Sequence, residues 1–252
     1  MKLKYFSVLS GLIFLFIMSM ASCGNEADNC LDNKDCLNAG ICVDGNCICP
    51  QGFLGTLCES YDPAKVQALL DQGLSPFEIF QAGIPLDSIY GKVYKDGFIF
   101  YLDKNFGTGL LADLNDINTN GARYGCSSLD FLSFKVKDYP PDSGPEIEEG
   151  ARLGDGPVNT DNILEECNEA NIAARLCRQK GENWFMPSRE ELHLMYVNLH
   201  DKGLGNFKQD YYWTSSYNTG GNSWMIRFIA GEEYGTQANF VKSQVRAVRV
   251  FD

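Results

Sequence analysis

The chain has 252 residues, of which 44% are hydrophobic and 21% are charged, and its formal net charge at pH 7 is −12. A chain this acidic is repelled by polyanions at long range, which argues against nucleic acid and heparin-like glycans as partners. Its ten cysteines favour an oxidising compartment outside the cytoplasm.

Residues 1–22 predict a lipoprotein signal peptide. Two lysines precede an apolar run over residues 8–18, and Met20-Ala-Ser-Cys23 comes after it. An apolar core this short, followed by small residues, is typical of a cleaved signal rather than of a membrane span. Cys23 resembles the cysteine of a bacterial lipobox, which carries the lipid and becomes the mature N-terminus. An ordinary secretory signal, with Cys23 in a disulfide, is the alternative.

Residues 23–29 are short, polar and acidic, and predict a tether between the membrane and the first module. They also resemble the signals after the lipidated cysteine that send lipoproteins of Bacteroidetes-type bacteria to the outer face of the outer membrane. We therefore expect an outer-membrane lipoprotein displayed on the cell surface, which contacts the membrane through its N-terminal lipid only.

Six cysteines lie between Cys30 and Cys58 with the spacing C-x5-C-x5-C-x4-C-x-C-x8-C. Because so short a segment cannot bury enough apolar surface to fold alone, we expect disulfides to stabilise it. The spacing alone leaves their pairing open. A zinc–thiolate cluster is the alternative, although the usual C-x2-C pairs of zinc sites are missing.

The spacing resembles that of the EGF-like domain, with Gly52 and Gly55 where that family places its final turn. The resemblance implies the pairs Cys30–Cys42, Cys36–Cys47 and Cys49–Cys58. Some EGF-like modules bind calcium near their entrance, and acidic or amide groups occur here at Glu26, Asp28, Asn29 and Asp44. The loop after Cys42 is short and lacks the usual aromatic residue, which favours a disulfide-linked spacer.

Residues 60–90 predict a helical connector. Asp62-Pro63 begins one helix, whose apolar stripe ends before Gly73, and Ser75 begins a second that runs to Gln81. We interpret the pair as a helical hairpin that acts as a rigid spacer.

Residues 91–252 are long enough to form one domain with its own core. The strands predicted in this domain are 98–102, 109–112, 211–216, 223–229 and 244–251, and residues 138–150 predict an exposed acidic loop. A capping box, Ser188-x-x-Glu191, begins a helix there. Helices followed by short antiparallel strands predict an α+β fold.

The clearest helical periodicity covers residues 160–179. Apolar residues recur on one face at Ile163, Cys167, Ala170, Ala174 and Cys177. In one helix, Cys167 and Cys177 would lie about 15 Å apart along the axis and could not bond to each other. We therefore expect one of them to pair with Cys126, and Cys167 is our choice.

Four segments carry a resemblance to a known family: WFMPSREEL (184–192), YWTSS (212–216), SWMIRF (223–228) and VRAVR (245–249). They resemble the bacterial extracytoplasmic family named for the C-terminal domain of a Legionella collagen-like adhesin. The resemblance implies a C-type-lectin-like fold, related to that of the formylglycine-generating enzyme, over residues 91–252. It also implies a role in adhesion or ligand binding.

Aromatic residues near two of these segments are the best ligand-binding candidates, because aromatic faces stack on sugar rings and anchor peptides. Alternation puts Trp224 on one face of its strand with Ile226 and Phe228, which favours a core position for this residue over ligand contact. A core position is also the other interpretation for Trp213. The turn from Tyr217 to Asn222 is the favoured contact. The full candidate set is Trp213, Tyr217, Asn218, Asn222, Trp224 and Arg227.

Catalytic and metal motifs are sparse. His193 and His200 are too far apart on one helix to share a metal, and we expect both to face solvent. No Ser/His/Asp arrangement or phosphate loop occurs. The sulfatase-activating relatives use reactive cysteines late in the domain, whereas no cysteine follows Cys177 here. We therefore predict no enzyme activity. Asp116, Asn118 and Asn120 match the opening of a calcium loop, but Ser127 stands where a bidentate acid belongs. An Asn/Gly-rich turn explains the same residues, and no other cofactor is indicated.

Three functions are therefore compared. The first is a surface lipoprotein whose C-terminal domain binds an extracellular glycan or protein. The second is a structural subunit of an envelope assembly, which a wide exposed apolar patch would favour. The third is an extracytoplasmic enzyme, which a buried titratable pair in a cleft would favour.

Overall fold

The computed structural model describes residues 30–50, 52–117, 120–126, 151–217, 222–236 and 241–252. The predicted signal peptide, Cys23, the tether and the acidic loop at 138–150 lie outside these residues. The described chain combines helices with small antiparallel sheets, which agrees with the α+β prediction. Within the described segments, none of the helices has the length and apolar character needed to cross a bilayer.

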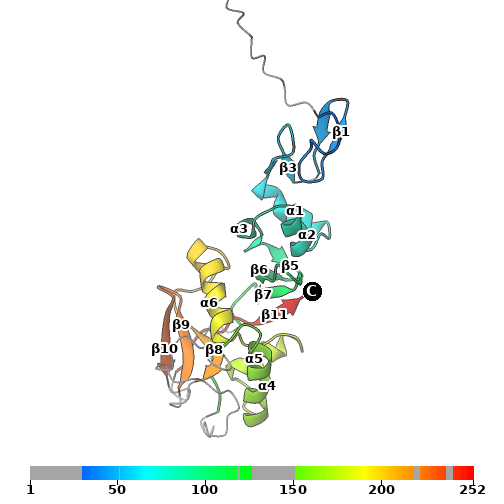
Figure 1. Cartoon of the computed structure of the whole chain (residues 1–252). Coiled ribbons are helices and arrows are strands. Elements are labelled where there is room, and N and C mark those ends of the chain that lie inside the picture. Colours follow the sequence, from blue (N-terminus) through cyan, green and yellow to red (C-terminus); the bar gives the residue numbers. More distant parts are fainter. Residues whose placement is uncertain (1–29, 51, 118–119, 127–150, 218–221, 237–240) are drawn as a thin grey trace, which may run out of the picture.

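Residues 30–58 form a disulfide-linked module at one end of the molecule (Figure 1). Its bridges are Cys30–Cys42, Cys36–Cys47 and Cys49–Cys58, the pairs that the sequence resemblance implies. The strands β1 (Ile41–Val43) and β2 (Asn46–Ile48) form a hairpin, and β3 (Phe53–Leu54) pairs with β4 (Ser60–Tyr61). Cys42 lies opposite Cys47 in the hairpin, whereas Ile41 lies opposite Ile48 with both isoleucines more than half exposed.

The connector consists of short helices: η1 (Pro63–Lys65), α1 (Val66–Asp71), α2 (Pro76–Gln81) and α3 (Leu86–Ile89). A capping box begins α2, since Ser75 Oγ accepts from the Glu78 N–H and the Glu78 carboxylate accepts from the Ser75 N–H. The predicted helix pair is confirmed, and α3 is an addition. One apolar cluster joins module, connector and the following sheet: Phe53, Cys58, Val66, Leu69, Leu70, Ile79, Ile84, Ile89, Ile99, Leu111 and Phe251.

A four-stranded antiparallel sheet comes after the connector, in the order β11-β7-β6-β5. Its strands are β5 (Val93–Tyr94), β6 (Gly97–Leu102), β7 (Gly109–Asp113) and β11 (Val248–Phe251). The predicted pair at 98–102 and 109–112 is confirmed as β6 and β7. The last strand is shorter than predicted, because Ser243 and Gln244 make isolated bridges to Ala122 and Tyr212 before β11 begins.

The helix predicted over 160–179 is wrong as a single element. The structure has α4 (Gly156–Glu166) and α5 (Ala173–Gln179), and Cys167 between them is extended, with φ −133° and ψ 115°. Tertiary contacts override the periodicity: Cys167 is bonded to Cys126, and Ile172 makes a parallel bridge to Arg123. The expected Cys126–Cys167 pair is therefore present, and Cys177 remains a buried free thiol.

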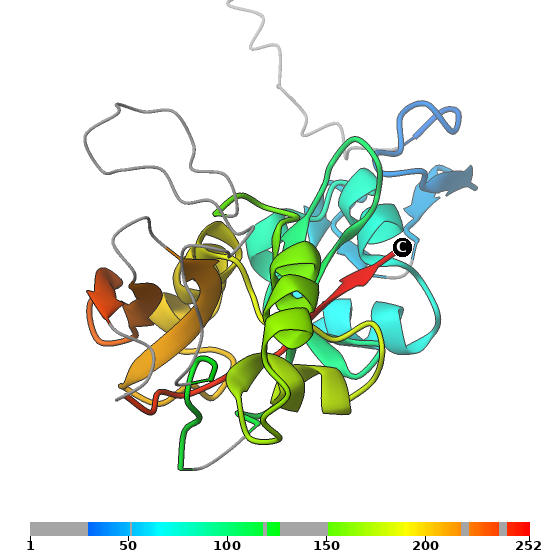
Figure 2. The ribbon, with the colours of Figure 1, turned by 90° about the horizontal axis from the view of Figure 1, so that it is seen from below.

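Helix α6 (Arg189–Asn198) begins with the predicted capping box of Ser188 and Glu191. Leu192, Met195 and Leu199 are fully buried against the four-stranded sheet and the strands β8 (Tyr211–Tyr217) and β9 (Ser223–Arg227). A 3-10 turn, η2 (His200–Lys202), ends at Gly203 in the left-handed conformation. Figure 2 shows α4 and α5 lying beside each other.

The C-terminal part contains a three-stranded antiparallel sheet in the order β10-β9-β8. Its strands are β8 (Tyr211–Tyr217), β9 (Ser223–Arg227) and β10 (Glu232–Thr236). The strand predicted over 223–229 ends at Arg227, since the Phe228 N–H donates to Asp210 O and Gly231, with φ 69°, turns the chain into β10. The sequence analysis missed β10.

The four segments that carry the family resemblance meet in the core of this domain. The Ser215 N–H donates to Pro187 O at 2.6 Å, and the Trp213 N–H donates to Gln244 O at 3.0 Å. Phe185 and Val248 exchange both backbone hydrogen bonds. Strands of the second and third segments also pair with each other, so the segments are held together by backbone pairing across the domain.

Candidate functional site

Two of the predicted ligand-binding residues are part of the core. Trp213 is fully buried, and its Nε1–H donates to Ala122 O at 2.7 Å. Tyr217 is 3% exposed and packs beside Tyr124, with 6.3 Å between ring centroids. Burial raises the pKa of Tyr217. Neither ring can stack on an external ligand, so the contact predicted at Tyr217 is wrong, and Trp213 takes the core position that was its other interpretation.

The other predicted residues that the structure describes are Trp224, Asn222 and Arg227, which lie nearer the surface but do not share one face. Trp224 is partly buried, with the Arg189 guanidinium 4.7 Å from its ring centroid. Alternation along β9 directs Arg227 to the opposite side of the sheet from Trp224. Asn222 is partly buried at the start of β9, and Asn218 lies outside the described residues.

The side of the three-stranded sheet that buries Trp213 and Met225 also carries a group of partly or fully exposed polar and aromatic side chains, which we call the Tyr211–Tyr234 face. Tyr211, Arg227 and Glu232 lie opposite one another across β8, β9 and β10. The rings of Tyr211 and Tyr234 meet edge to face with centroids 5.3 Å apart. Arg227 Nη1 and the Tyr234 hydroxyl each contact Glu232 Oε2 at 3.2 Å.

Electrostatics at this face depend on Glu232. Its carboxylate raises the pKa of Tyr234 and, by accepting a hydrogen bond, also raises the pKa of Arg227. Both groups therefore keep their neutral and cationic forms, respectively, at physiological pH. The face offers two tyrosine rings, a guanidinium and a carboxylate, which suits hydrogen bonding and stacking rather than proton transfer.

Of the predicted calcium residues, Asp116 has a structural role. Asp116 is the counter-ion of Arg246, which is fully buried, with Arg246 Nη2 2.7 Å from Asp116 Oδ1. The other carboxylate oxygen, Oδ2, accepts from the Tyr212 hydroxyl at 2.9 Å. With both oxygens engaged by donors, Asp116 is unsuited to a cation. Asn120 is exposed, and Asn118 lies outside the described residues.

The two histidines occupy different surroundings. His193 is exposed on α6, as predicted. His200 is only partly exposed, because it lies in η2 among the rings of Tyr196, Phe207 and Phe228, with centroid distances of 5.2 to 6.1 Å. Burial lowers its pKa. The prediction that both histidines face solvent is thus wrong for His200, which packs as an aromatic residue.

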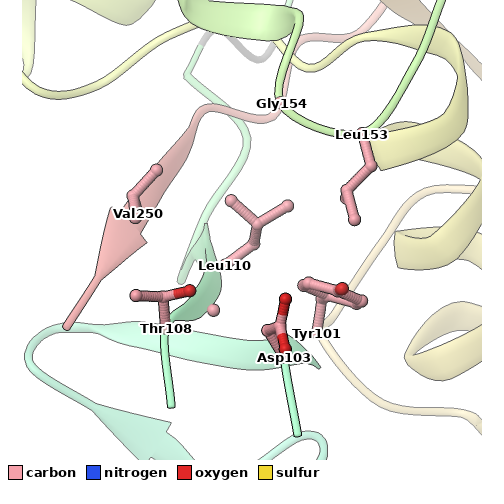
Figure 3. A pocket seen from close by; sticks show the side chains of 8 residues that line it. Tyr101, Asp103, Thr108, Leu110, Leu153, Gly154 and Val250 are labelled. Atoms are coloured by element: carbon pink, nitrogen blue, oxygen red, sulfur yellow. The ribbon is translucent and has the colours of Figure 1, made fainter. Parts of the chain in front are cut away.

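A cavity of about 200 Å³ lies at the end of β6 and β7 (Figure 3). Leu110 and Val250 form an apolar wall on the sheet, and Leu153 covers them from the segment before α4. Three oxygen-bearing side chains line the other side: Tyr101, Asp103 and Thr108. Nothing in the sequence analysis indicated this cavity, because its residues come from four separate parts of the chain.

Residues 151–156, which cover the cavity, are fastened to the start of α6. The Leu153 N–H donates to Glu190 Oε2, and the Gly154 N–H donates to Glu191 Oε1. A Cβ at Gly156 would collide with the carboxylate of Glu191, so glycine is required for this close approach. Burial raises the pKa of Glu191 to about 7, although the N–H groups of Ser188, Gly154 and Gly156 act in the opposite direction.

Sulfur atoms of Cys30, Cys36 and Cys47 lie within 4.8 Å of one another. All three belong to disulfides, so they offer no thiolates, and the zinc alternative does not fit this geometry. Cys177 is buried beside Asp113, and burial raises the pKa of its thiol. It therefore lacks the thiolate character of a nucleophile.

No protein-family model matches the chain, and no curated protein is significantly similar to it.

Glu232 and Tyr234 were not among the predicted residues, although the sequence around them contains a hairpin pattern. A run ending at Ile229, the turn at Ala230-Gly231, and a short segment with Tyr234 and Thr236 together predict a hairpin.

Proposed function

We propose that this protein is a surface lipoprotein that binds an extracellular glycan or protein ligand. Residues 30–58 would be an EGF-like module, and residues 91–252 a C-type-lectin-like domain. The module is packed onto the connector and sheet, which supports its role as a spacer that holds the binding domain away from the membrane.

The observation that carries the proposal is the Tyr211–Tyr234 face. Tyr234 is 40% exposed, and its ring is fixed in place by contact with Tyr211 rather than by burial. Ordered aromatic rings lose little entropy on binding, and they supply stacking area to sugar rings or peptide side chains. Arg227 and Glu232 add planar donors and acceptors at the same position.

Catalysis is not part of the proposal. His200 is engaged in an aromatic cluster, and the Glu191 carboxyl accepts backbone hydrogen bonds beneath residues 151–156. Both side chains therefore take part in contacts that stabilise the fold.

The test is binding of the full chain to an array of neutral and acidic glycans, with calcium and with EDTA. We expect Tyr234→Ala to weaken a specific signal at least about tenfold, since the stacking ring is lost. Ile229→Ala is the matched control, because this exposed residue lies in the same hairpin but outside the face. An array without any specific signal would remove glycans as the ligand and leave protein ligands.

A docking role in an envelope assembly is the second candidate, favoured by one observation. Ile41, Val43 and Ile48 are each about half exposed on the free face of the β1–β2 hairpin. Such an apolar face is typical of a protein contact. If this face mediates assembly, Ile41→Ser with Ile48→Ser should abolish cross-links from the module to envelope proteins and leave glycan binding unchanged.

A further inference from the structure

The cavity between β6, β7, β11 and residues 151–156 combines an apolar wall with acceptor groups at one side. The wall contains Leu110 and Leu153, and Val250, which is half exposed, lies at its open edge. Its volume of about 200 Å³ equals the liquid volume of about seven waters, which is room for a four-carbon chain with one polar head.

The polar side of the cavity is acidic. Asp103 Oδ1 accepts from the N–H groups of Asn105 and Phe106, at 2.8 and 3.3 Å, and this fixes the carboxylate in a turn. Figure 3 shows the carboxylate between the Thr108 hydroxyl and the Tyr101 ring. None of the residues that line the cavity is a lysine or an arginine.

Tyr101 lies in the negative potential of this carboxylate. Burial raises its pKa first, and the charges of Asp103 and Glu190 raise it further. Two carboxylates therefore act on the same phenol, which stays protonated. Its hydroxyl, the Thr108 hydroxyl and the Asp103 carboxylate together can accept hydrogen bonds from one ammonium group.

We propose that this cavity binds a primary alkylammonium group, with the aliphatic chain on Leu110, Leu153 and Val250 and the ammonium at Asp103. An ammonium has three donors and needs acceptors, which the polar side supplies. The formal net charge of −12 attracts cations to the molecule at long range. An alkyl anion would face the Asp103 charge, and a neutral alcohol would leave that charge without a counter-ion.

The alkylammonium group can come from two sources: a lysine side chain of a partner protein or a free aliphatic amine. The two sources share the ammonium and its aliphatic chain, and they differ in the group attached beyond the fourth carbon. A lysine continues into a peptide backbone, which would have to pass the open edge of β11 at Val250.

The experiment is a methyl-detected NMR titration of the full chain at constant ionic strength. The probes are n-butylamine, 1-butanol, and lysine blocked as its N-acetyl methylamide. We expect saturable shifts of the Leu110, Leu153 and Val250 methyl groups with butylamine and a far weaker response to butanol. If the blocked lysine binds as tightly as butylamine, the source is a protein side chain, and if only butylamine binds, it is a free amine.

Two variants decide whether Asp103 is responsible. Asp103→Asn keeps a side-chain oxygen for the turn but removes the charge, and should weaken butylamine at least about tenfold. Asp96→Asn is the matched control: it removes one exposed charge at the other end of β6, about 20 Å away, where φ is 64° and asparagine is tolerated. Equal responses to butylamine and butanol, or equal affinities of the two variants, would overturn the proposal.

Discussion

Residues 30–58 are held by three disulfides within one short segment, whereas residues 91–252 depend on a buried ion pair, buried carboxyl groups and one long-range disulfide. The module exposes large apolar side chains, including Leu31, Ile41 and Ile48. The domain instead buries polar ones, including Ser215, Glu191 and Arg246.

Because of this difference, the two parts should respond differently to substitutions. A covalently linked module does not need a closed apolar core, so its surface is free to carry contacts. A domain that buries charges is stable only while every partner of those charges stays in place. Substitutions in the two parts should therefore differ in how much they lower the free energy of unfolding and in how far along the chain they act.

The largest effect is expected at Arg246. Its guanidinium is fully buried and donates to Asp116 and to the backbone oxygens of Asp113, Gly205 and Asn206. Arg246→Met leaves Asp116 without its counter-ion, so the free energy of unfolding should fall by about 3–5 kcal/mol. Urea unfolding followed by circular dichroism measures it.

Arg249→Met is the matched control. Arg249 lies in β11, three residues after Arg246, and contacts the Trp184 ring at 5.0 Å, so its loss should cost about 1 kcal/mol or less. Replacing both partners, with Arg246→Met and Asp116→Leu, should recover part of the loss. Equal effects at Arg246 and Arg249 would contradict a special role for the buried pair.

A smaller and local effect is expected from Cys36→Ser with Cys47→Ser. Removing this bridge should destabilise residues 30–58 by about 2–4 kcal/mol, so that amides of β1 and β2 exchange faster with solvent. The amides of β7 and α6 should keep their protection, because the domain has its own core. Loss of protection throughout the chain would mean that module and domain unfold as one unit.

Features that depend on local sequence could be predicted. The spacing of six cysteines indicated a disulfide module, and the Ser188-x-x-Glu191 pattern placed the start of α6. The β6–β7 pair was evident from two apolar runs around a turn. Each of these is decided by residues close together in the chain.

Features decided by distant contacts could not be predicted. The periodicity over 160–179 continues through Cys167, but the contacts with Cys126 and Arg123 draw that segment out of a helix. Trp213 looked like a stacking residue because its burial depends on Ala122, far away in the sequence. Asp116 looked like a calcium ligand because its partner, Arg246, lies near the C-terminus.

The smallest expected effect concerns pH and Glu191. Burial raises the pKa of its carboxyl to about 7 in the folded protein, against 4.5 as its ordinary value. The folded state therefore holds this proton more tightly than the unfolded state does. The resulting stabilisation is complete below about pH 4.5 and is lost as pH rises through about 7, a gradual change of at most about 3 kcal/mol.

Glu191→Gln should flatten this dependence, measured as the difference between variant and wild-type unfolding free energies from pH 4.5 to 8. The neighbouring Glu190→Gln is the control, because it removes a carboxylate from the same helix turn but keeps the buried group. A wild-type slope that survives Glu191→Gln would show that the buried carboxyl does not couple stability to pH. In that case the N–H groups of Ser188, Gly154 and Gly156 would stabilise the carboxylate enough to cancel the cost of its burial.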